Sequence, residues 1–186
     1  METLPKTQVQ PTKKQNYVAA GMILVVLFTL VAFAINAFQS IFFPKIIDPL
    51  QDLQTQVEKE LHQSNRDVKR ISEFDFDASS QTINITIAGN DNLTEAFINR
   101  GFETDIINTL KTIYQSNTTL TYKSVSILIT LPTVDKFGNI RETKMFRGLY
   151  LRATLDMINF ENVQEKNIFE LADPDTLYLH PSVNPF

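Results

Sequence analysis

The chain has 186 residues, no cysteine, two histidines and a formal net charge of −4. Without cysteine, it has no disulfides, no thiol chemistry, no lipid-modified cysteine and none of the usual structural zinc sites. The acidic balance disfavours binding to nucleic acid, because phosphate backbones attract basic surfaces.

An uncharged stretch near the N-terminus is the clearest feature of the sequence. Residues 16–44 contain no charged side chain and no histidine, and residues 18–38 contain only two polar ones, Thr29 and Asn36. A bilayer core is about 30 Å thick and is crossed by about 20 helical residues. We therefore expect residues 18–43 to form a transmembrane helix, so that one partner of the chain is the lipid bilayer.

The charges on either side of this stretch predict its orientation. Lys6, Lys13 and Lys14 precede it against one acid, Glu2, whereas residues 45–186 carry 14 Lys and Arg against 20 Asp and Glu. Positively charged flanks stay in the cytoplasm. We expect residues 1–17 to form a disordered cytoplasmic tail and the remainder to lie outside the cytoplasm, anchored in the cell membrane by a single pass.

A cleaved secretory signal is the alternative. Ala32-Phe33-Ala34 has the small-residue form of a cleavage site, and residues 19–31 have the character of a signal core. The segment before that core is long for a signal, and the apolar stretch continues to Phe43. These features favour an uncut anchor, while cleavage after Ala34 stays open.

Beyond the anchor, residues 44–73 are expected to hold a juxtamembrane amphipathic helix. Apolar residues recur at spacings of three and four over residues 50–71, with one gap of seven at Ser64 and Asn65. The gap argues against a sustained coiled coil, although a short one stays open. Otherwise the helix packs on the following domain or spaces it from the bilayer.

Residues 74–186 are expected to form an α+β domain outside the cytoplasm. Alternating apolar residues predict one hairpin over residues 71–87 and a second over residues 122–153, with a loop at 135–139. Pro132 is expected to end the first strand of the second hairpin. The fold class is then a small antiparallel sheet of about four strands packed with helices.

Two further helices are expected in this domain. The first follows a capping pair, Asn92 and Glu95, and carries an apolar stripe from Leu93 to Ile113. The second covers residues 163–172 behind Asn162 and Glu165. Residues 177–181 add an edge strand or lie on the surface.

The candidates for chemistry are few, and none is assigned a catalytic, cofactor or metal role. His62 and His180 lie in separate predicted elements, the first in the helix after the uncharged stretch and the second in the C-terminal tail. Two acidic groups have the ligand type for a hard cation but lack the EF-hand pattern, and solvated strands explain them equally well. These groups are Glu73, Asp75 and Asp77, and Asp135, Asn139 and Glu142.

Several surface patterns remain open. Basic residues interspersed in residues 140–153 indicate either the solvent-exposed face of a strand or a basic stripe that binds an acidic partner or anionic polymer. Three acceptor patterns for glycosylation begin at Asn84, Asn92 and Asn117, and the sequence does not decide whether they carry sugar. Within the predicted span, Asn36 has the chemistry to bond a neighbouring helix.

These observations predict a non-enzymatic interaction subunit, single-pass and membrane-anchored. We expect an accessory or scaffold role in a cell-envelope assembly such as a secretion or conjugation machine, a layout shared by many such subunits. Its partners would be other membrane or envelope proteins, with self-association as an option, docked on strand edges in residues 122–131 or 140–153. The alternative is a secreted or anchored ligand-binding or sensor module, with a pocket between the helix at residues 93–113 and the sheet.

Overall fold

A computed structural model describes residues 25–26, 28–33, 48–91 and 94–183. The chain divides into two compact units, Met1–Ile46 and Ile47–Phe186. In the first unit the described residues are helical, and their large apolar side chains are 55–75% exposed. Among the described residues, no helix has the length and apolar character needed to cross a membrane. Most of the predicted span, the Ala34 cleavage site and the N-terminal tail lie outside them.

One polar side chain in this helical stretch satisfies its hydrogen bond internally. The hydroxyl of Thr29 donates to the carbonyl oxygen of Val26 at 2.8 Å. A hydroxyl bonded in this way presents no unpaired donor to its surroundings, which an apolar solvent would penalise. The exposed face of these residues is therefore apolar in effect as well as in composition.

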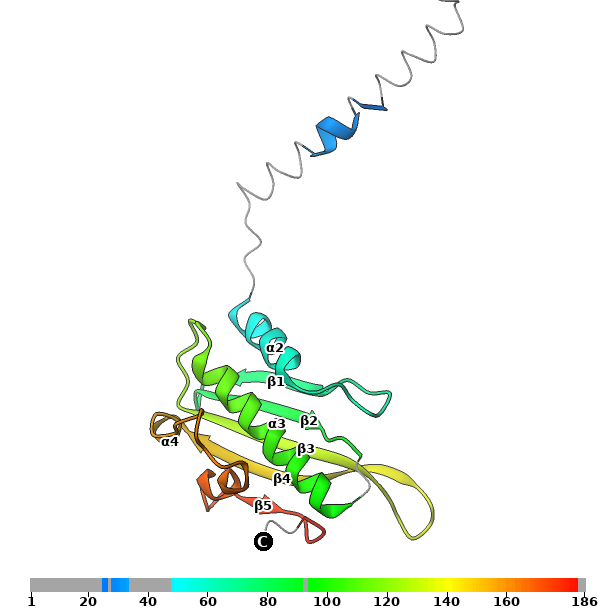
Figure 1. The fold of residues 1–186 in the computed structure, drawn as a ribbon, viewed down its shortest axis with the longest axis vertical. Coiled ribbons are helices and arrows are strands. Elements are labelled where there is room, and N and C mark those ends of the chain that lie inside the picture. Colours follow the sequence, from blue (N-terminus) through cyan, green and yellow to red (C-terminus); the bar gives the residue numbers. More distant parts are fainter. Residues whose placement is uncertain (1–24, 27, 34–47, 92–93, 184–186) are drawn as a thin grey trace, which may run out of the picture. The chain divides into compact units, whose positions relative to one another are not determined.

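The second unit contains a five-stranded sheet (Figure 1). The strands lie in chain order across it, and each has a defined range: β1 Ile71–Asp77, β2 Thr82–Ala88, β3 Ser124–Val134, β4 Ile140–Leu151 and β5 Tyr178–Leu179. The two hairpins expected from the sequence, β1–β2 and β3–β4, are confirmed, as is an edge strand from the C-terminal tail.

The expectation of a fully antiparallel sheet is wrong, because β2 and β3 run parallel. The helix α3 (Glu95–Gln115) leaves the end of β2 and returns the chain to the opposite end of the sheet. Parallel neighbours need a crossover of this kind, usually a helix. The sequence shows the helix between the hairpins, and the crossover makes the sheet mixed.

The hydrophobic core lies between α3 and one face of the sheet. Four apolar side chains of α3, each at most 1% exposed, pack towards the fully buried isoleucines of β2 and β3: Phe102, Ile106, Leu110 and Ile113. Thr94, whose hydroxyl accepts from the Phe97 amide at 3.4 Å, caps the helix. The predicted capping residue Asn92 lies outside the described residues.

A helix is present in residues 44–73, where a juxtamembrane helix was expected, but it is shorter than expected. The helix α2 covers Pro49–Glu60 and buries Leu53 and Val57 in the same core, so it packs on the domain. The predicted extension to residue 71 is wrong. The chain instead forms a bent connector, residues 61–70, in which the Ser64 hydroxyl accepts from the Arg66 amide. The Asn65 side chain bonds the backbone N–H and carbonyl of Asp91, in the loop after β2.

The strand β3 runs through Pro132, which was expected to end it. Thr130 is the last residue of β3 paired with β2, and its carbonyl oxygen accepts from Gly89 on that side. Two residues later, the nitrogen of Pro132 points the same way, towards an edge that β2 no longer occupies. Proline is tolerated in a strand where its missing N–H faces no ladder partner.

The predicted helix over residues 163–172 is wrong. The chain makes a short helix, α4 (Arg152–Leu155), and two turns of 3₁₀ helix, η1 (Glu165–Asn167) and η2 (Phe169–Leu171), without a side-chain cap at Gln164. The cause is tertiary: the Tyr150 hydroxyl donates to the carbonyl of Ile168 at 3.1 Å, and both Ile168 and Phe169 are buried in the core.

Candidate interaction surface

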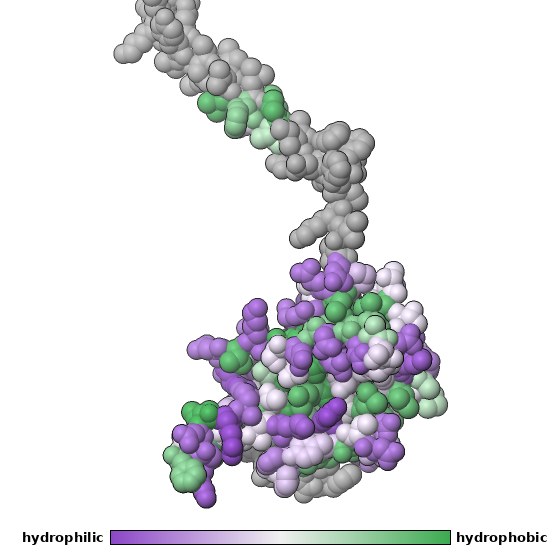
Figure 2. All heavy atoms as spheres, turned by 180° about the vertical axis from the view of Figure 1, so that it is seen from behind, coloured by the Kyte–Doolittle hydropathy of each residue, from purple (hydrophilic) through white to green (hydrophobic). Residues whose placement is uncertain are grey.

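The second face of the sheet carries no helix of the described residues (Figure 1). Helices α2 and α3 and the 3₁₀ turns pack on the opposite face. Strand register places an alternate set of side chains on this open side, which we call the bare face: Glu73, Asp75, Thr86, Asn84, Ser126, Leu128, Thr130, Lys144, Arg147, Leu149, Leu151 and Tyr178. Figure 2 views the domain from this side and shows polar and apolar side chains interspersed.

The bare face has an ordered charge distribution. One row crosses all five strands in register, from an acid through a hydroxyl and an apolar residue to a cation and an aromatic ring: Glu73, Thr86, Leu128, Arg147 and Tyr178. Acids occupy the edge strand β1, and cations occupy β4. The centre is uncharged, with half-buried Ser126, Leu128 and Leu149.

Local hydrogen bonds hold the acidic edge in place. Thr86 donates to Glu73 and Asn84 donates to Asp75, each at 3.0 Å across the β1–β2 pair. At the turn, Ser79 and Ser80 donate to Asp77 and lower its pKa to about 2, so this carboxyl stays ionised at neutral pH. The sheet and its turn therefore orient these acids.

The strand edges differ from those expected to dock partners. The strand β3 lies between β2 and β4, so residues 124–130 offer no free edge, and that expectation is wrong. The outer edge of β4 is partly covered by β5 and by the His180 amide, which donates to Met145. Edges without a sheet partner among the described residues include those of β1, of the two-residue β5 and of the β3–β4 ribbon beyond Thr130.

The two histidines lie in different elements. His62 belongs to the connector after α2, and His180 follows β5, where its Nδ1 lies 2.7 Å from the Ser182 hydroxyl. Asp135 and Asn139 bond each other within their turn, while Glu142 pairs with Arg66 instead. No group of three metal-ligating side chains occurs in the part of the chain that the structure describes.

The acceptor patterns also fall in different environments. Asn84 is half-buried at the centre of the bare face, whereas Asn117 is exposed in the loop after α3. Asn92 and Asn36 lie outside the described residues.

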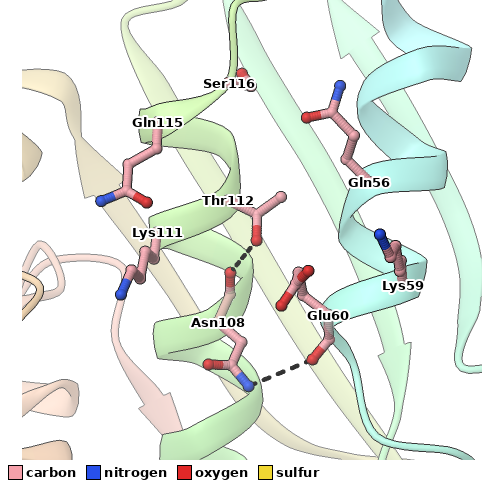
Figure 3. A pocket seen from close by; sticks show the side chains of 8 residues that line it. All are labelled: Gln56, Lys59, Glu60, Asn108, Lys111, Thr112, Gln115 and Ser116. Carbon is pink, nitrogen blue, oxygen red and sulfur yellow. Dashed lines mark hydrogen bonds between the residues drawn. The ribbon is translucent and has the colours of Figure 1, made fainter.

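A hollow of about 480 Å³ lies between α2 and α3 (Figure 3). Its walls are polar, and Asn108 closes one end by donating to the Glu60 carbonyl at 3.4 Å. Lys111 reaches away to Glu161, at 2.8 Å. The pocket that a sensor was expected to have, between α3 and the sheet, is instead filled by the fully buried core.

Sequence reasoning missed a buried ion pair beside the connector. Arg70 donates to Asp105 of α3 and to the carbonyl of Ala88, and both side chains are under 10% exposed. Burial raises the pKa of Asp105, and the Arg70 charge opposes that shift. The two residues lie 35 positions apart, so no local pattern marks them.

Comparison with known proteins finds no family model, no curated protein and no solved structure that matches this chain.

Proposed function

We propose that this chain is a single-pass membrane protein whose C-terminal domain lies outside the cytoplasm and serves as a non-enzymatic interaction subunit. Its role would be that of an accessory or scaffold in a cell-envelope assembly, such as a secretion or conjugation machine. The uncharged stretch at residues 16–44 and the internally bonded Thr29 support the anchor.

The bare face of the sheet is the observation that carries the interaction role. Protein interfaces have an uncharged, partly apolar centre inside a polar and charged rim. Leu128, Leu149 and Ser126 supply such a centre, with acids along β1 and cations along β4 as the rim. The opposite signs at the two sides give a partner one favoured orientation, because complementary charge fixes register.

A charged residue at the centre of this face tests the proposal. Ser126→Lys adds a cation where the side chain points to solvent, so the domain is expected to fold and its partner to be lost. Met157→Lys is the matched control, because Met157 is 79% exposed and lies after α4, away from the bare face. The full chain, tagged and solubilised from its native membrane, is purified in each form, and the co-purifying proteins are compared.

The expected result is a stable partner, either another protein or a second copy, retained by wild type and by Met157→Lys but lost in Ser126→Lys. A wild-type chain that purifies alone under gentle solubilisation would contradict the interaction role. Equal loss in the two variants would contradict the bare face as its site. Thermal melting of both variants checks that the domain is intact.

Placement is tested separately through the absence of native cysteine. A single cysteine at Met157 is exposed, and a membrane-impermeant maleimide applied to intact cells will label it if the domain lies outside the cytoplasm. Labelling that requires cell lysis would overturn the proposed topology. Release of the labelled domain from washed membranes would favour the cleaved signal.

A ligand-binding or sensor module is the second candidate, and the hollow between α2 and α3 is the observation in its favour. Native mass spectrometry of the full chain from its own membrane would then show a bound small molecule. Gln115→Trp, which fills the hollow from an exposed position on α3, is expected to displace it. Identical spectra for wild type and variant would remove this candidate.

A further inference from the structure

The β3–β4 hairpin projects beyond the rest of the sheet (Figure 1). Pairing with β2 ends at Thr130, while β3 continues to Val134 and β4 begins at Ile140. At about 3.3 Å per residue, the four residues after Thr130 extend about 13 Å. We call residues 131–143 the arm.

The arm is braced rather than loose. The hydroxyls of Thr133 and Thr143 lie 2.5 Å apart across the ribbon. Arg66 of the connector donates to the carbonyl of Gly89 and pairs with Glu142 at the base. At the turn, Asp135 accepts the amides of Phe137 and Asn139 at 2.8 and 2.9 Å. These bonds hold the turn residues in fixed positions at the end of the arm.

The turn displays apolar side chains to solvent. Val134 is 68% exposed, Phe137 78% and Ile140 75%. Val134 and Ile140 face each other as a cross-strand pair, and Phe137 lies in the loop between them. Exposed apolar residues gathered at one point, on a turn that is built to hold them there, indicate that something covers them.

The charges beside these residues are predominantly positive. Lys136 and Arg141 are exposed, and the Lys136 ammonium lies 4.9 Å from the centre of the Phe137 ring. Glu142 pairs with Arg66, while Asp135 accepts turn amides that lower its pKa and keep it ionised. Residues 134–141 carry two cations against one acid, so the end of the arm is apolar with a net charge of +1, on a chain whose net charge is −4.

We propose that the end of the arm inserts into an anionic lipid surface. Apolar and aromatic side chains flanked by Lys and Arg enter the boundary between headgroups and acyl chains, to a depth of about 5–10 Å. The arm is long enough to reach that depth while the sheet stays outside. Each basic residue near an anionic leaflet adds about a fivefold preference.

Lipid fits this surface better than the other occupants considered. A stable protein interface buries about 800 Å² on each partner, more than three side chains at the end of a ribbon supply. An anionic envelope polymer would satisfy Lys136 and Arg141 but would leave Phe137 and its neighbours in water. Of these occupants, only an anionic bilayer accommodates both the apolar side chains and the two cations.

The test uses the full chain, which has no native cysteine, with a single cysteine at Ile140 carrying an environment-sensitive nitrobenzoxadiazole label. The protein is reconstituted into vesicles of phosphatidylcholine alone and of phosphatidylcholine with phosphatidylglycerol. The matched control carries the label at Met157, an equally exposed apolar position outside the arm. Flotation of each sample with its vesicles reports anchoring independently of the label.

Insertion predicts a blue-shifted, brighter signal at position 140 in the anionic vesicles and little change at position 157. In the same background, the double variant K136Q/R141Q is expected to lower the ratio of inserted to free arm about 30-fold, from about a fivefold preference per cation. Both substituted residues are exposed, so the domain is expected to stay folded.

Equal signals in the two lipid compositions, or no effect of K136Q/R141Q, would overturn the proposal. The inference rests on the proposed membrane placement only for access to lipid. Failure to float would count against the anchor alone.

Discussion

The two hairpins of this domain have the same hydrogen bonds in their turns but expose different side chains there, polar in the first and apolar in the second. In each, an aspartate at the start of the turn accepts the amide two residues later, Asp77 from Ser79 and Asp135 from Phe137, both at 2.8 Å. The first hairpin carries serines at its turn and lies flush with the sheet. The second projects and displays Phe137. The turn device fixes the backbone, while the side chains around it decide what the hairpin contacts.

The connector between α2 and β1 contacts both hairpins, through two arginines that differ in burial. The buried Arg70 bonds the carbonyl of Ala88, at the end of the first hairpin, and the carboxylate of Asp105. Arg66 bonds the carbonyl of Gly89 and pairs with Glu142 of the second hairpin, whose side chain is 49% exposed. Since charge pairs weaken with exposure to water, the two ion pairs should contribute differently to stability.

The largest effect is expected from Arg70→Ala. The change leaves the Asp105 carboxylate buried without its partner, a situation that costs about 3–5 kcal/mol of unfolding free energy. Urea unfolding of the full chain in non-ionic detergent, followed by circular dichroism, measures the loss. Lys69→Ala, one position away and exposed, is the control and should change stability by about 0.5 kcal/mol or less.

A rescue variant sharpens this prediction. Replacing both partners, as Arg70→Met with Asp105→Leu, removes the two buried charges together and should recover most of the loss. If Arg70→Ala lowered the free energy of unfolding no more than Lys69→Ala, the buried Arg70–Asp105 pair would contribute nothing to stability.

Gly89→Ala is expected to have the next largest effect, at the point where the second hairpin leaves the sheet. A Cβ built there would lie 2.9 Å from Phe102, 3.0 Å from Leu131 and 3.1 Å from the Thr130 carbonyl oxygen. Crowding of this kind in a packed core costs about 1–3 kcal/mol. The same urea unfolding measures it, and Phe102→Leu in the Gly89→Ala background should relieve part of the cost.

Gly138→Ala, in the turn of the second hairpin, provides the contrast. Nothing lies within 4 Å of a Cβ at Gly138, but its φ is +86°, which disfavours an L side chain. We expect a loss of about 1 kcal/mol from backbone strain alone, with no rescue by Phe102→Leu. A rescue common to both glycines would show that crowding is not what distinguishes Gly89.

Much of this fold follows from the sequence, and the failures have physical causes. Alternation of apolar residues predicted both hairpins, because a strand with one buried face must alternate. It missed the parallel pairing of β2 and β3, since alternation marks faces and not neighbours. The sequence also predicted that Pro132 ends β3, although a missing N–H disrupts a strand only where a neighbouring strand would accept its hydrogen bond.

The candidate surfaces divide in the same way. The charged rims of the bare face were visible as Glu73, Asp75 and Arg147 within strand patterns. The joining of these residues into one row required strand order, which depends on the α3 crossover. The exposed state of Phe137 was equally hidden, because an aromatic in a hairpin loop packs or projects according to where the neighbouring strands end.

Arg66→Ala tests the more exposed ion pair, between Arg66 and Glu142. Because Glu142 is half exposed, losing the pair should cost only about 1 kcal/mol or less of global stability. Its effect should instead be local, as faster amide hydrogen exchange in residues 131–143 with no change in residues 71–88. Uniform acceleration across both hairpins would mean that Arg66 supports the whole domain and not the arm.

The smallest effect is expected from acid titration of the two turns. Hydrogen bonds to the carboxylates lower the folded-state pKa of Asp77 to about 2 and also lower the pKa of Asp135. A group whose pKa is depressed by folding stabilises the folded state above its unfolded pKa, and that contribution is lost as the pH falls through the folded value. For Asp77 the loss runs from about pH 4 down to about pH 2.

Asp77→Asn and Asp135→Asn keep an accepting oxygen but no charge, so each should make the free energy of unfolding depend less on pH in this range. Urea unfolding at a series of pH values measures the slope. Since the same turn device serves both hairpins, the two variants should act in the same direction, and a steeper acid dependence in either one would separate the turns that the geometry makes alike.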